Sequence, residues 1–323
     1  MKKYVLSLVS LLLVILGSLY IYYNTDVNKE TIRVSEVTHS PFYAPWYVAL
    51  DNGYFKEEGL DIEVILTSGA DKVSASVLSG DVEIGFCGPE STIYIYNGGM
   101  KDYLISFAGL TKKDGQFIVS RKQYDNFDLT MLNNKEVLAG RSGGMPVINF
   151  MNALKNNNIK QVKINTDVEF ANLGSSFISG NGDFVNLFEP NATMLEKQGF
   201  GYIVGNIGTL SGNVPYTAFN TKLSYYNENK DVIKKFNNAL NKGLAYVNSH
   251  TPEEIAKIIT KEFPDISLND LILIVKHYKD NDTWYLNTSI PEEDFKNLQG
   301  MMIDNNLIDS YVNYQKLVYD LNE

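Results

Sequence analysis

The sequence predicts an α/β fold of two units followed by a largely helical C-terminal region, and three observations predict it. Short apolar runs alternate with helical patterns from residue 32 onward, which is typical of βαβ units around a mostly parallel sheet. This alternation restarts at Glu136. From Glu228 onward, apolar residues recur at steps of three and four, which is the spacing of amphipathic helices.

The first unit is expected to contain five strands and three helices. Its strands are predicted at Ile32–Val37, Ile62–Leu66, Val82–Cys87, Leu104–Leu110 and Phe117–Ser120. Its helices are predicted at Pro45–Leu50, Lys72–Leu78 and Pro89–Tyr96, two of them opened by a proline at a first-turn position.

The second unit repeats this alternation. Its strands are predicted at Glu136–Ala139, Val162–Val168, Asp183–Phe188 and Tyr202–Val204, and its helices at Pro146–Leu154 and Pro190–Lys197. A further strand at Val214–Phe219 leads into the helical C-terminal region. In that region, one apolar stripe joins Val232, Ile233, Phe236, Leu240, Leu244 and Val247.

Extended segments near Ser120 and Pro215 can serve as crossovers between the units. We therefore expect the second unit to be inserted into the first. Residues 31–119 and 215–323 then form lobe 1, residues 120–214 form lobe 2, and residues 1–30 precede both.

The N-terminus carries an export or anchoring signal. Lys2 and Lys3 precede an apolar run from Val5 to Tyr23, which as a helix would span roughly 28 Å, close to the thickness of a bilayer core. Gly17 and Ser18 offer only a poor cleavage site, so an uncleaved membrane helix is favoured over a cleaved signal peptide. Either interpretation places the folded part outside the cytoplasm.

Composition excludes several classes of function. The formal net charge of −10 argues against nucleic acid as a partner. The single cysteine, Cys87, rules out an intrachain disulfide, and we interpret it as a small buried residue. His39, His250 and His277 are scattered without ligand spacing, so we expect no metal and no cofactor.

Ligands of open α/β sheets bind at the carboxyl ends of strands, which draws attention to five loops. The loop after the first strand contains His39, Phe42, Tyr43 and Trp46, and its aromatic rings could stack on a ring-bearing ligand. The alternative is that Trp46 packs inside the lobe. Ser68, after the second strand, suits hydrogen bonding to a ligand, with a helix cap as the alternative.

The loop after the third strand contains Gly88, Glu90 and Ser91 around Pro89. Pro89 leaves the N–H groups at the start of a helix free, and these favour negative charge. That charge could belong to a ligand or to Glu90 itself. If Glu90 instead turns inward, it favours a cationic or N–H-bearing ligand. The sequence leaves these alternatives open.

In the second unit, a similar loop precedes a helix that begins at Pro146. Glycines allow close backbone approach, and Arg141 adds a forked donor that suits sulfonate, phosphate or carboxylate groups. The candidate residues of this loop are Arg141, Ser142, Gly143, Gly144 and Met145. The fifth loop contributes Asn186 and Glu189, with Glu189 either a helix-cap charge or an acceptor for ligand N–H groups. Tyr216, near the returning crossover, could close the pocket.

Three segments carry a resemblance to a known family, namely residues 49–64 (ALDNGYFKEEGLDIEV), 78–85 (LSGDVEIG) and 88–91 (GPES). In their order and spacing they resemble the exported receptors of nitrate, sulfonate, taurine and thiamine-pyrimidine importers, and the resemblance covers roughly residues 32–250. It implies a two-lobed, periplasmic-binding-protein-like clamshell of type II with the ligand between the lobes.

The resemblance also implies a function. We expect a monomeric solute receptor, held by its N-terminal segment on the outer face of the membrane, that delivers ligand to an ABC importer permease and ATPase. Aromatic residues and Arg141 indicate a sulfonate or taurine-like anion, or a thiamine-type pyrimidine. A surface sensor is one alternative. A pyrimidine-synthesising enzyme of the same superfamily is another, but its cysteine-rich iron-binding motif cannot be made with one cysteine, so we expect no catalysis.

Overall fold

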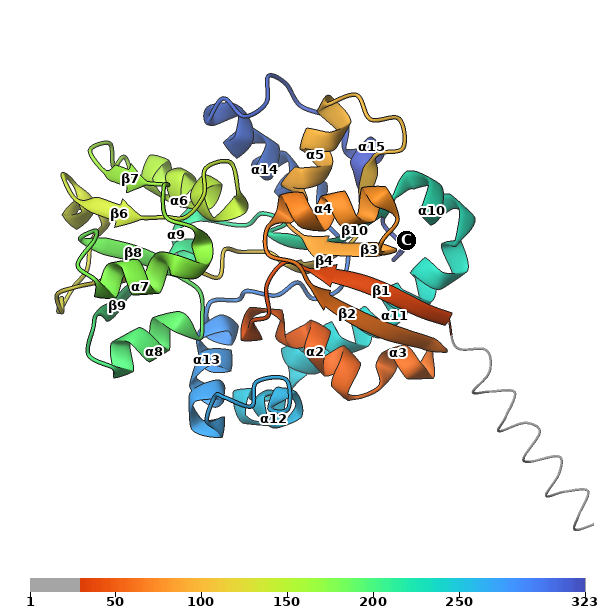
Figure 1. The fold of residues 1–323 in the computed structure, drawn as a ribbon, viewed down its shortest axis with the longest axis horizontal. Helices are drawn as coiled ribbons and strands as arrows, with labels where there is room; N and C mark the ends of the chain where they lie inside the picture. Colours follow the sequence, from red (N-terminus) through yellow and green to blue (C-terminus); the bar gives the residue numbers. More distant parts are fainter. Residues whose placement is uncertain (1–29, 323) are drawn as a thin grey trace, which may run out of the picture.

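Two five-stranded mixed sheets form the centres of two lobes (Figure 1) in a computed structural model that describes residues 30–322. The first sheet has the spatial order β2 (Leu60–Leu66), β1 (Glu30–Glu36), β3 (Ile84–Cys87), β10 (Thr217–Lys222) and β4 (Leu104–Thr111). The second has the order β7 (Lys163–Asn165), β6 (Glu136–Leu138), β8 (Phe184–Leu187), β5 (Phe117–Ser120) and β9 (Tyr202–Asn206). The predicted two-lobed α/β fold is confirmed.

Both sheets follow the same plan. Three neighbouring strands run parallel, and the fourth strand in the order runs antiparallel to its neighbours. In each sheet this fourth strand is one that enters from the other lobe, β10 in the first and β5 in the second. Each lobe is therefore completed by a strand that adjoins a crossover.

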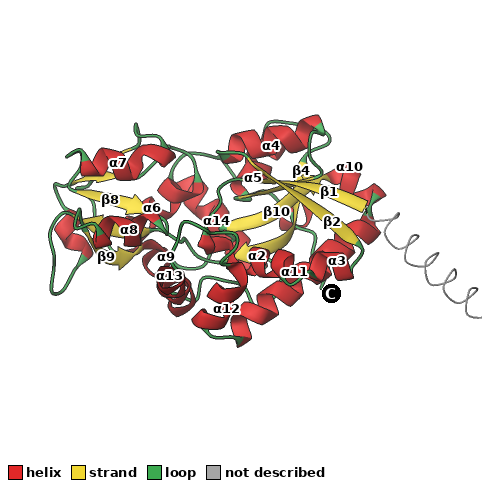
Figure 2. Ribbon diagram, turned by 60° about the horizontal axis from the view of Figure 1, so that its bottom comes forward, coloured by secondary structure: helices red, strands yellow, loops and turns green. Residues whose placement is uncertain are grey.

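Helices cover both faces of each sheet (Figure 2). In the first lobe, α4 (Ala70–Ser79) and α5 (Glu90–Asn97) lie on one face, and α2 (Ala44–Asp51) and α11 (Lys230–Ser249) on the other. In the second lobe, α7 (Leu173–Ile178) and α8 (Asn191–Lys197) lie on one face, and α6 (Met145–Asn156) and α9 (Ile207–Ser211) on the other. The remaining helices are α3 (Tyr54–Glu57), α10 (Leu223–Glu228), α12 (Pro252–Ile259), α13 (Leu268–Asp280), α14 (Glu292–Asp304) and α15 (Tyr314–Leu317), with short 3-10 turns at Pro41–Tyr43, Leu129–Leu132 and Phe170–Asn172.

The two crossovers run side by side. The backbone N–H of Val214 donates to the carbonyl of Lys112 (3.0 Å), and that of Tyr216 donates to the carbonyl of Thr111 (2.9 Å). The first crossover precedes β5, so it lies at residues 112–116, a few residues earlier than the position near Ser120 that the sequence indicated. The strand itself was placed correctly, but its apolar pattern does not encode which sheet it joins.

Helix α11 carries the predicted apolar stripe into the core of the first lobe. Val232, Phe236, Leu240 and Leu244 are all buried, and α11 packs against α2. Gly243 lies at the closest approach, since a β-carbon there would stand 2.2 Å from the carbonyl oxygen of Pro45. Close packing of these two helices therefore depends on the missing side chain.

The predicted N-terminal membrane helix lies outside the described residues. Among residues 30–322, no helix combines the length and hydrophobicity that crossing a bilayer requires.

We expect Gly243→Ala to lower the free energy of unfolding by about 1–3 kcal/mol, because the new methyl group must push α11 away from α2. Gly174→Ala in α7 is the matched control, since a β-carbon there meets no atom within 4 Å. Urea unfolding of both variants checks this. Equal stabilities would contradict the packing argument.

Candidate functional site

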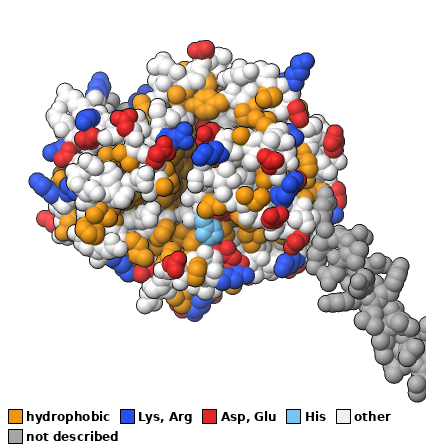
Figure 3. Space-filling view, viewed as in Figure 1, with side chains coloured by type: hydrophobic (Ala, Val, Ile, Leu, Met, Phe, Trp, Pro, Cys, Tyr) orange, Lys and Arg blue, Asp and Glu red, His pale blue; other side chains and the backbone are white. Residues whose placement is uncertain are grey.

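The loops at the carboxyl ends of the strands bring the lobes into contact. The Ser40 hydroxyl donates to the carbonyl of Glu189 (2.8 Å), and the Tyr94 hydroxyl donates to the carbonyl of Gly143 (3.1 Å). The rings of Phe42 and Phe188 pack with their centroids 5.3 Å apart. Figure 3 shows the surface hollowed between the lobes, with apolar side chains around the hollow. The structure therefore shows the lobes in a closed arrangement.

Several buried polar atoms at this junction make no hydrogen bond with the residues described. They are Glu90 Oε2, Asp114 Oδ2, Gln116 Oε1, Asn186 Nδ2 and Oδ1, and the Tyr216 hydroxyl. An unsatisfied buried polar atom costs about 1–3 kcal/mol, so a cluster of them is unusual in a folded protein. We call these five residues the polar cluster.

The polar cluster is continuous from lobe 1 to lobe 2. Tyr216 interacts electrostatically with Glu90. Its hydroxyl also lies near enough to the Asp114 carboxyl group for each to shift the pKa of the other, although the pair does not meet the distance and angle limits of a hydrogen bond. The backbone N–H of Gln116 donates to Asp114 Oδ1 (2.7 Å), and Gln116 Nε2 donates weakly to the carbonyl of Asn186 (3.5 Å). One lobe, both crossovers and the other lobe thus supply adjoining unsatisfied groups.

Glu90 lies between the first turns of α5 and α6. A β-carbon on Gly88 would stand 1.9 Å from Glu90 Oε2 and 2.6 Å from Met145 Cγ, so the carboxyl and Met145 meet over this glycine. Burial raises the pKa of Glu90 to about 8, and hydrogen bonding by backbone N–H groups of Glu90, Met145 and Ser91 opposes that rise. The sequence left the direction of Glu90 open, and the structure turns it inward.

Asp114 and Tyr216 occupy the two crossovers. Both are buried, and burial is the main cause that raises the pKa of each well above its ordinary value. Asp114 receives a hydrogen bond from the backbone of Gln116, which only partly offsets that rise. A second carboxyl group therefore joins Glu90 in this junction.

The first aromatic loop divides between core and junction. Phe42 contacts Phe188 and Tyr216, and Tyr43 lies on Phe86 and near enough to Glu90 for electrostatic interaction. Trp46 is instead a core residue, whose indole N–H donates to Glu36 Oε2 (2.9 Å). Its ring packs against Phe55, Phe86, Phe219 and Phe236.

His39 is committed to structural contacts. Its Nδ1 lies 3.2 Å from Glu36 Oε1, and its Nε2 lies 2.9 Å from the carbonyl oxygen of Glu262. The hydrogen bond to Glu36 is the main cause that raises the pKa of His39. Both ring nitrogens of His39 are engaged, and Trp46 is a core residue, so neither belongs to the proposed site.

The glycine-rich loop of the second lobe lies at the rim. Arg141 and Ser142 are exposed, and the Arg141 guanidinium stands 3.7 Å from Asp71 of the first lobe. Ser68 is also exposed on the first-lobe side of this rim. Because the side chain of Arg141 is 54% exposed, its contact with Asp71 contributes little to stability.

Deeper in this loop, the chain turns inward. Gly143 accepts the inter-lobe hydrogen bond from Tyr94, Gly144 precedes α6, and Met145 is buried against Glu90. Ser91 is engaged locally, since its hydroxyl donates to the carbonyl of Gly88 (2.9 Å).

Both carboxylate oxygens of Glu189 already have hydrogen-bond partners in the protein. Its carboxylate accepts from the backbone N–H of Thr193 (2.9 Å) and the Thr193 hydroxyl (2.7 Å), and it pairs with His277 Nδ1 at 2.8 Å. Its backbone N–H donates to the Tyr278 hydroxyl (3.0 Å). Of the two sequence interpretations, the structure favours the helix cap, and α13 is clamped to the second lobe through this residue.

The sequence missed Asp114 and Gln116. Both lie in the first crossover, which was expected a few residues later. The polar run Lys112–Gln116 between two apolar strands was the available signal, but such a run is equally typical of a solvent-exposed turn.

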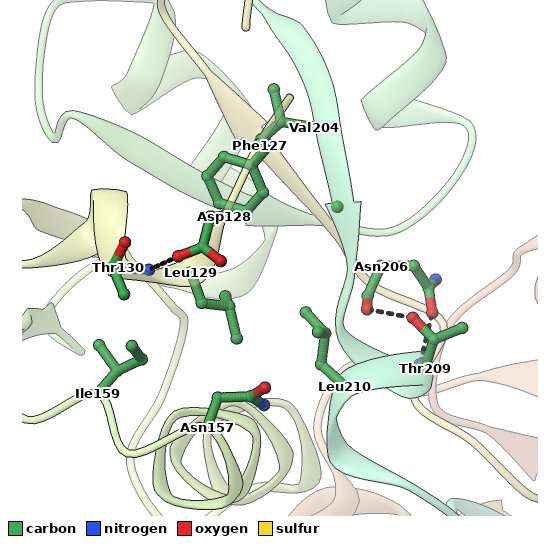
Figure 4. A pocket seen from close by; sticks show the side chains of 11 residues that line it. Phe127, Asp128, Leu129, Thr130, Asn157, Ile159, Val204, Asn206, Thr209 and Leu210 are labelled. Atoms are coloured by element: carbon green, nitrogen blue, oxygen red, sulfur yellow. Dashed lines mark hydrogen bonds between the residues drawn. The ribbon is translucent and has the colours of Figure 1, made fainter. Parts of the chain in front are cut away.

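A separate surface pocket of about 290 Å³ lies on the second lobe (Figure 4). Its polar side chains are already used locally. Asp128 accepts from the backbone N–H of Thr130 (2.8 Å), and Asn206 accepts from that of Thr209 (2.9 Å). This pocket therefore lacks the unsatisfied groups that distinguish the polar cluster. Among residues 30–322, no group of three or more His, Cys, Asp or Glu side chains could hold a metal ion.

Comparisons with known proteins give the family and the fold. A family model described as "NMT1/THI5 like" matches residues 40–255. The Bacillus subtilis (strain 168) protein named "Putative binding protein YtlA" is 37% identical over 310 residues, which cover 94% of this chain and 93% of that protein.

Two solved structures share the fold at low sequence identity. The alkanesulfonate-binding protein SsuA from Xanthomonas axonopodis pv. citri, bound to MOPS, aligns with a TM-score of 0.71 at 12% identity, covering 90% of this chain and 98% of that chain. The periplasmic nitrate-binding protein NrtA from Synechocystis PCC 6803 aligns with a TM-score of 0.66 at 16% identity, covering 89% and 86%.

We expect Glu90→Gln to flatten the dependence of stability on pH. Burial keeps Glu90 protonated in the folded protein up to about pH 8, whereas the unfolded chain loses this proton near pH 4.5. The folded state binds more protons between these values, so the wild-type free energy of unfolding falls as pH rises, by at most about 1.4 kcal/mol per pH unit. Urea unfolding at pH 5, 6.5 and 8 measures the slope, and parallel slopes for wild type and variant would contradict the assignment.

Proposed function

Because the chain belongs to the NMT1/THI5-like family, we propose that it is an extracytoplasmic solute receptor that captures a small organic molecule between its lobes and delivers it to an ABC importer permease. The chain is a substrate-binding protein of the ABC import type, as its relatives and its periplasmic-binding-protein fold indicate. The ligand, the delivery step, the monomeric state and anchoring by the N-terminal segment are our proposals.

The polar cluster is the observation that supports capture between the lobes. Unsatisfied buried atoms come from α5 of the first lobe, from both crossovers and from β8 of the second lobe. A ligand that forms hydrogen bonds with these atoms contacts both lobes and both crossovers at the same time. Binding then favours the closed arrangement, since only that arrangement brings all of these groups together.

The paired crossovers supply the hinge in this proposal. Residues 112–116 and 212–216 are short, and they connect the lobes without a helix or strand of their own. Helix α13 bridges the lobes a third time, because His277 and Tyr278 hold Glu189. We propose that closure is a rotation about the crossovers with α13 as a brace.

Our candidates for the ligand are a sulfonate or taurine-like anion and a thiamine-type pyrimidine. The rings of Phe42, Tyr43 and Phe188 border the polar cluster and suit a flat ligand. Delivery distinguishes this receptor from a surface sensor. Binding without turnover distinguishes it from the pyrimidine-synthesising enzyme that the resemblance includes.

A thermal-shift screen of sulfonates, taurine and thiamine-type pyrimidines against the full chain tests the proposal. A true ligand should raise the melting temperature by several degrees and reduce the radius of gyration in solution scattering, because it stabilises the closed arrangement. Tyr216→Phe should weaken the shift, since it removes one hydroxyl of the polar cluster. A ligand that stabilises the protein without any compaction would refute closure.

A further inference from the structure

We propose that the Glu90 carboxyl group fills the position of a ligand anion, so that the junction selects neutral or cationic ligands bearing N–H groups and excludes sulfonates and nitrate. The proposal rests on the function proposed above and decides between its two ligand candidates. Its basis is the position of one carboxyl group between two helix N-termini.

The first turns of two helices meet at the junction from opposite lobes. Helix α5 begins at Glu90 and helix α6 at Met145, and neither has a side-chain cap on its first turn. Such N-termini attract anions, because unsatisfied N–H groups and the helix dipole both favour negative charge. A ligand anion could bind at these two N-termini only if no other group already occupied them.

Glu90 already uses that capacity. Backbone N–H groups of Glu90, Ser91 and Met145 all act on its carboxyl group, so both helices contribute. Gly88 provides the space, since any side chain there would collide with Glu90 Oε2 and Met145 Cγ. The carboxyl group therefore stands where an anionic ligand would otherwise be held.

The second carboxyl oxygen is left as an acceptor. Glu90 Oε2 is buried and makes no hydrogen bond with the described part of the chain, although the residue is only 3% exposed. The groups that interact electrostatically with Glu90 are Tyr43, Cys87, Tyr94 and Tyr216. None of them carries positive charge.

No described cation balances this site. Arg141 is at the exposed rim beside Asp71, and Lys112 and Lys113 pair with Asp282. Asp114 adds a second buried carboxyl group to the polar cluster. An incoming anion would meet two carboxyl groups without a buried counter-charge, whereas an N–H donor would give Oε2 the hydrogen bond that it lacks.

Isothermal titration of the full chain in mild detergent tests the inference with two probes. One is 4-amino-5-hydroxymethyl-2-methylpyrimidine, and the other is methanesulfonate. Wild type should bind the pyrimidine and not methanesulfonate. Glu90→Gln, which keeps the shape of the side chain, should weaken pyrimidine binding at least tenfold. Glu90→Ala frees both helix N-termini and should create measurable methanesulfonate binding.

The exposed Asp265→Asn is the matched control for net charge and should leave both titrations unchanged within twofold. Circular dichroism and urea unfolding establish that each variant is folded. Two results would overturn the inference: wild type binding methanesulfonate at least as tightly as the pyrimidine, or Glu90→Gln binding the pyrimidine within twofold of wild type.

The alanine variant keeps the inference separate from the proposed function. If wild type binds neither probe, a gain of methanesulfonate binding in Glu90→Ala still supports the role of Glu90, and no gain overturns it. The receptor function fails on a different result, namely that no compound of the broader screen compacts the protein.

Discussion

The pairing of the two crossovers is the constraint on which the site depends. Hydrogen bonds from Val214 and Tyr216 to the carbonyls of Lys112 and Thr111 hold the two connecting segments together. The first segment leads into β5, which completes the second sheet, and the second segment leads into β10, which completes the first sheet. Each sheet therefore depends on one of the two connections. As a result, the strand ends of both sheets face one junction, where the polar cluster forms.

The sequence predicted the elements well because their signals are local. Alternating apolar runs, prolines at helix starts and the stripe of α11 all act within a single element. The loops that follow the strands were identified by the same means, and the structure brings several of them together. Met145 and Glu90, which are 55 positions apart, meet over Gly88.

Other features depend on tertiary contacts that no local pattern carries. The aromatic residues of the first loop look alike in sequence, yet Phe42 faces the second lobe and Trp46 enters the core, where Glu36 receives its indole N–H. Strand β5 has an ordinary apolar pattern, and its membership of the second sheet follows only from its partners β8 and β9. Asp114 gains its significance from burial, which its polar neighbours in sequence do not suggest.

Glu90 and Glu189 show how packing separates structural from functional carboxyl groups. Both are buried glutamates next to a proline that follows a strand, so their sequence context is compatible with a helix cap and with a ligand contact in each case. Glu189 receives hydrogen bonds from Thr193 and pairs with His277, and no acceptor is left over. Glu90 keeps Oε2 unsatisfied at a junction where backbone N–H groups of two helices already act on its carboxyl group. A buried group without a partner is costly to the free protein, and a ligand that supplies the missing donor removes that cost, so the same atom couples closure to recognition.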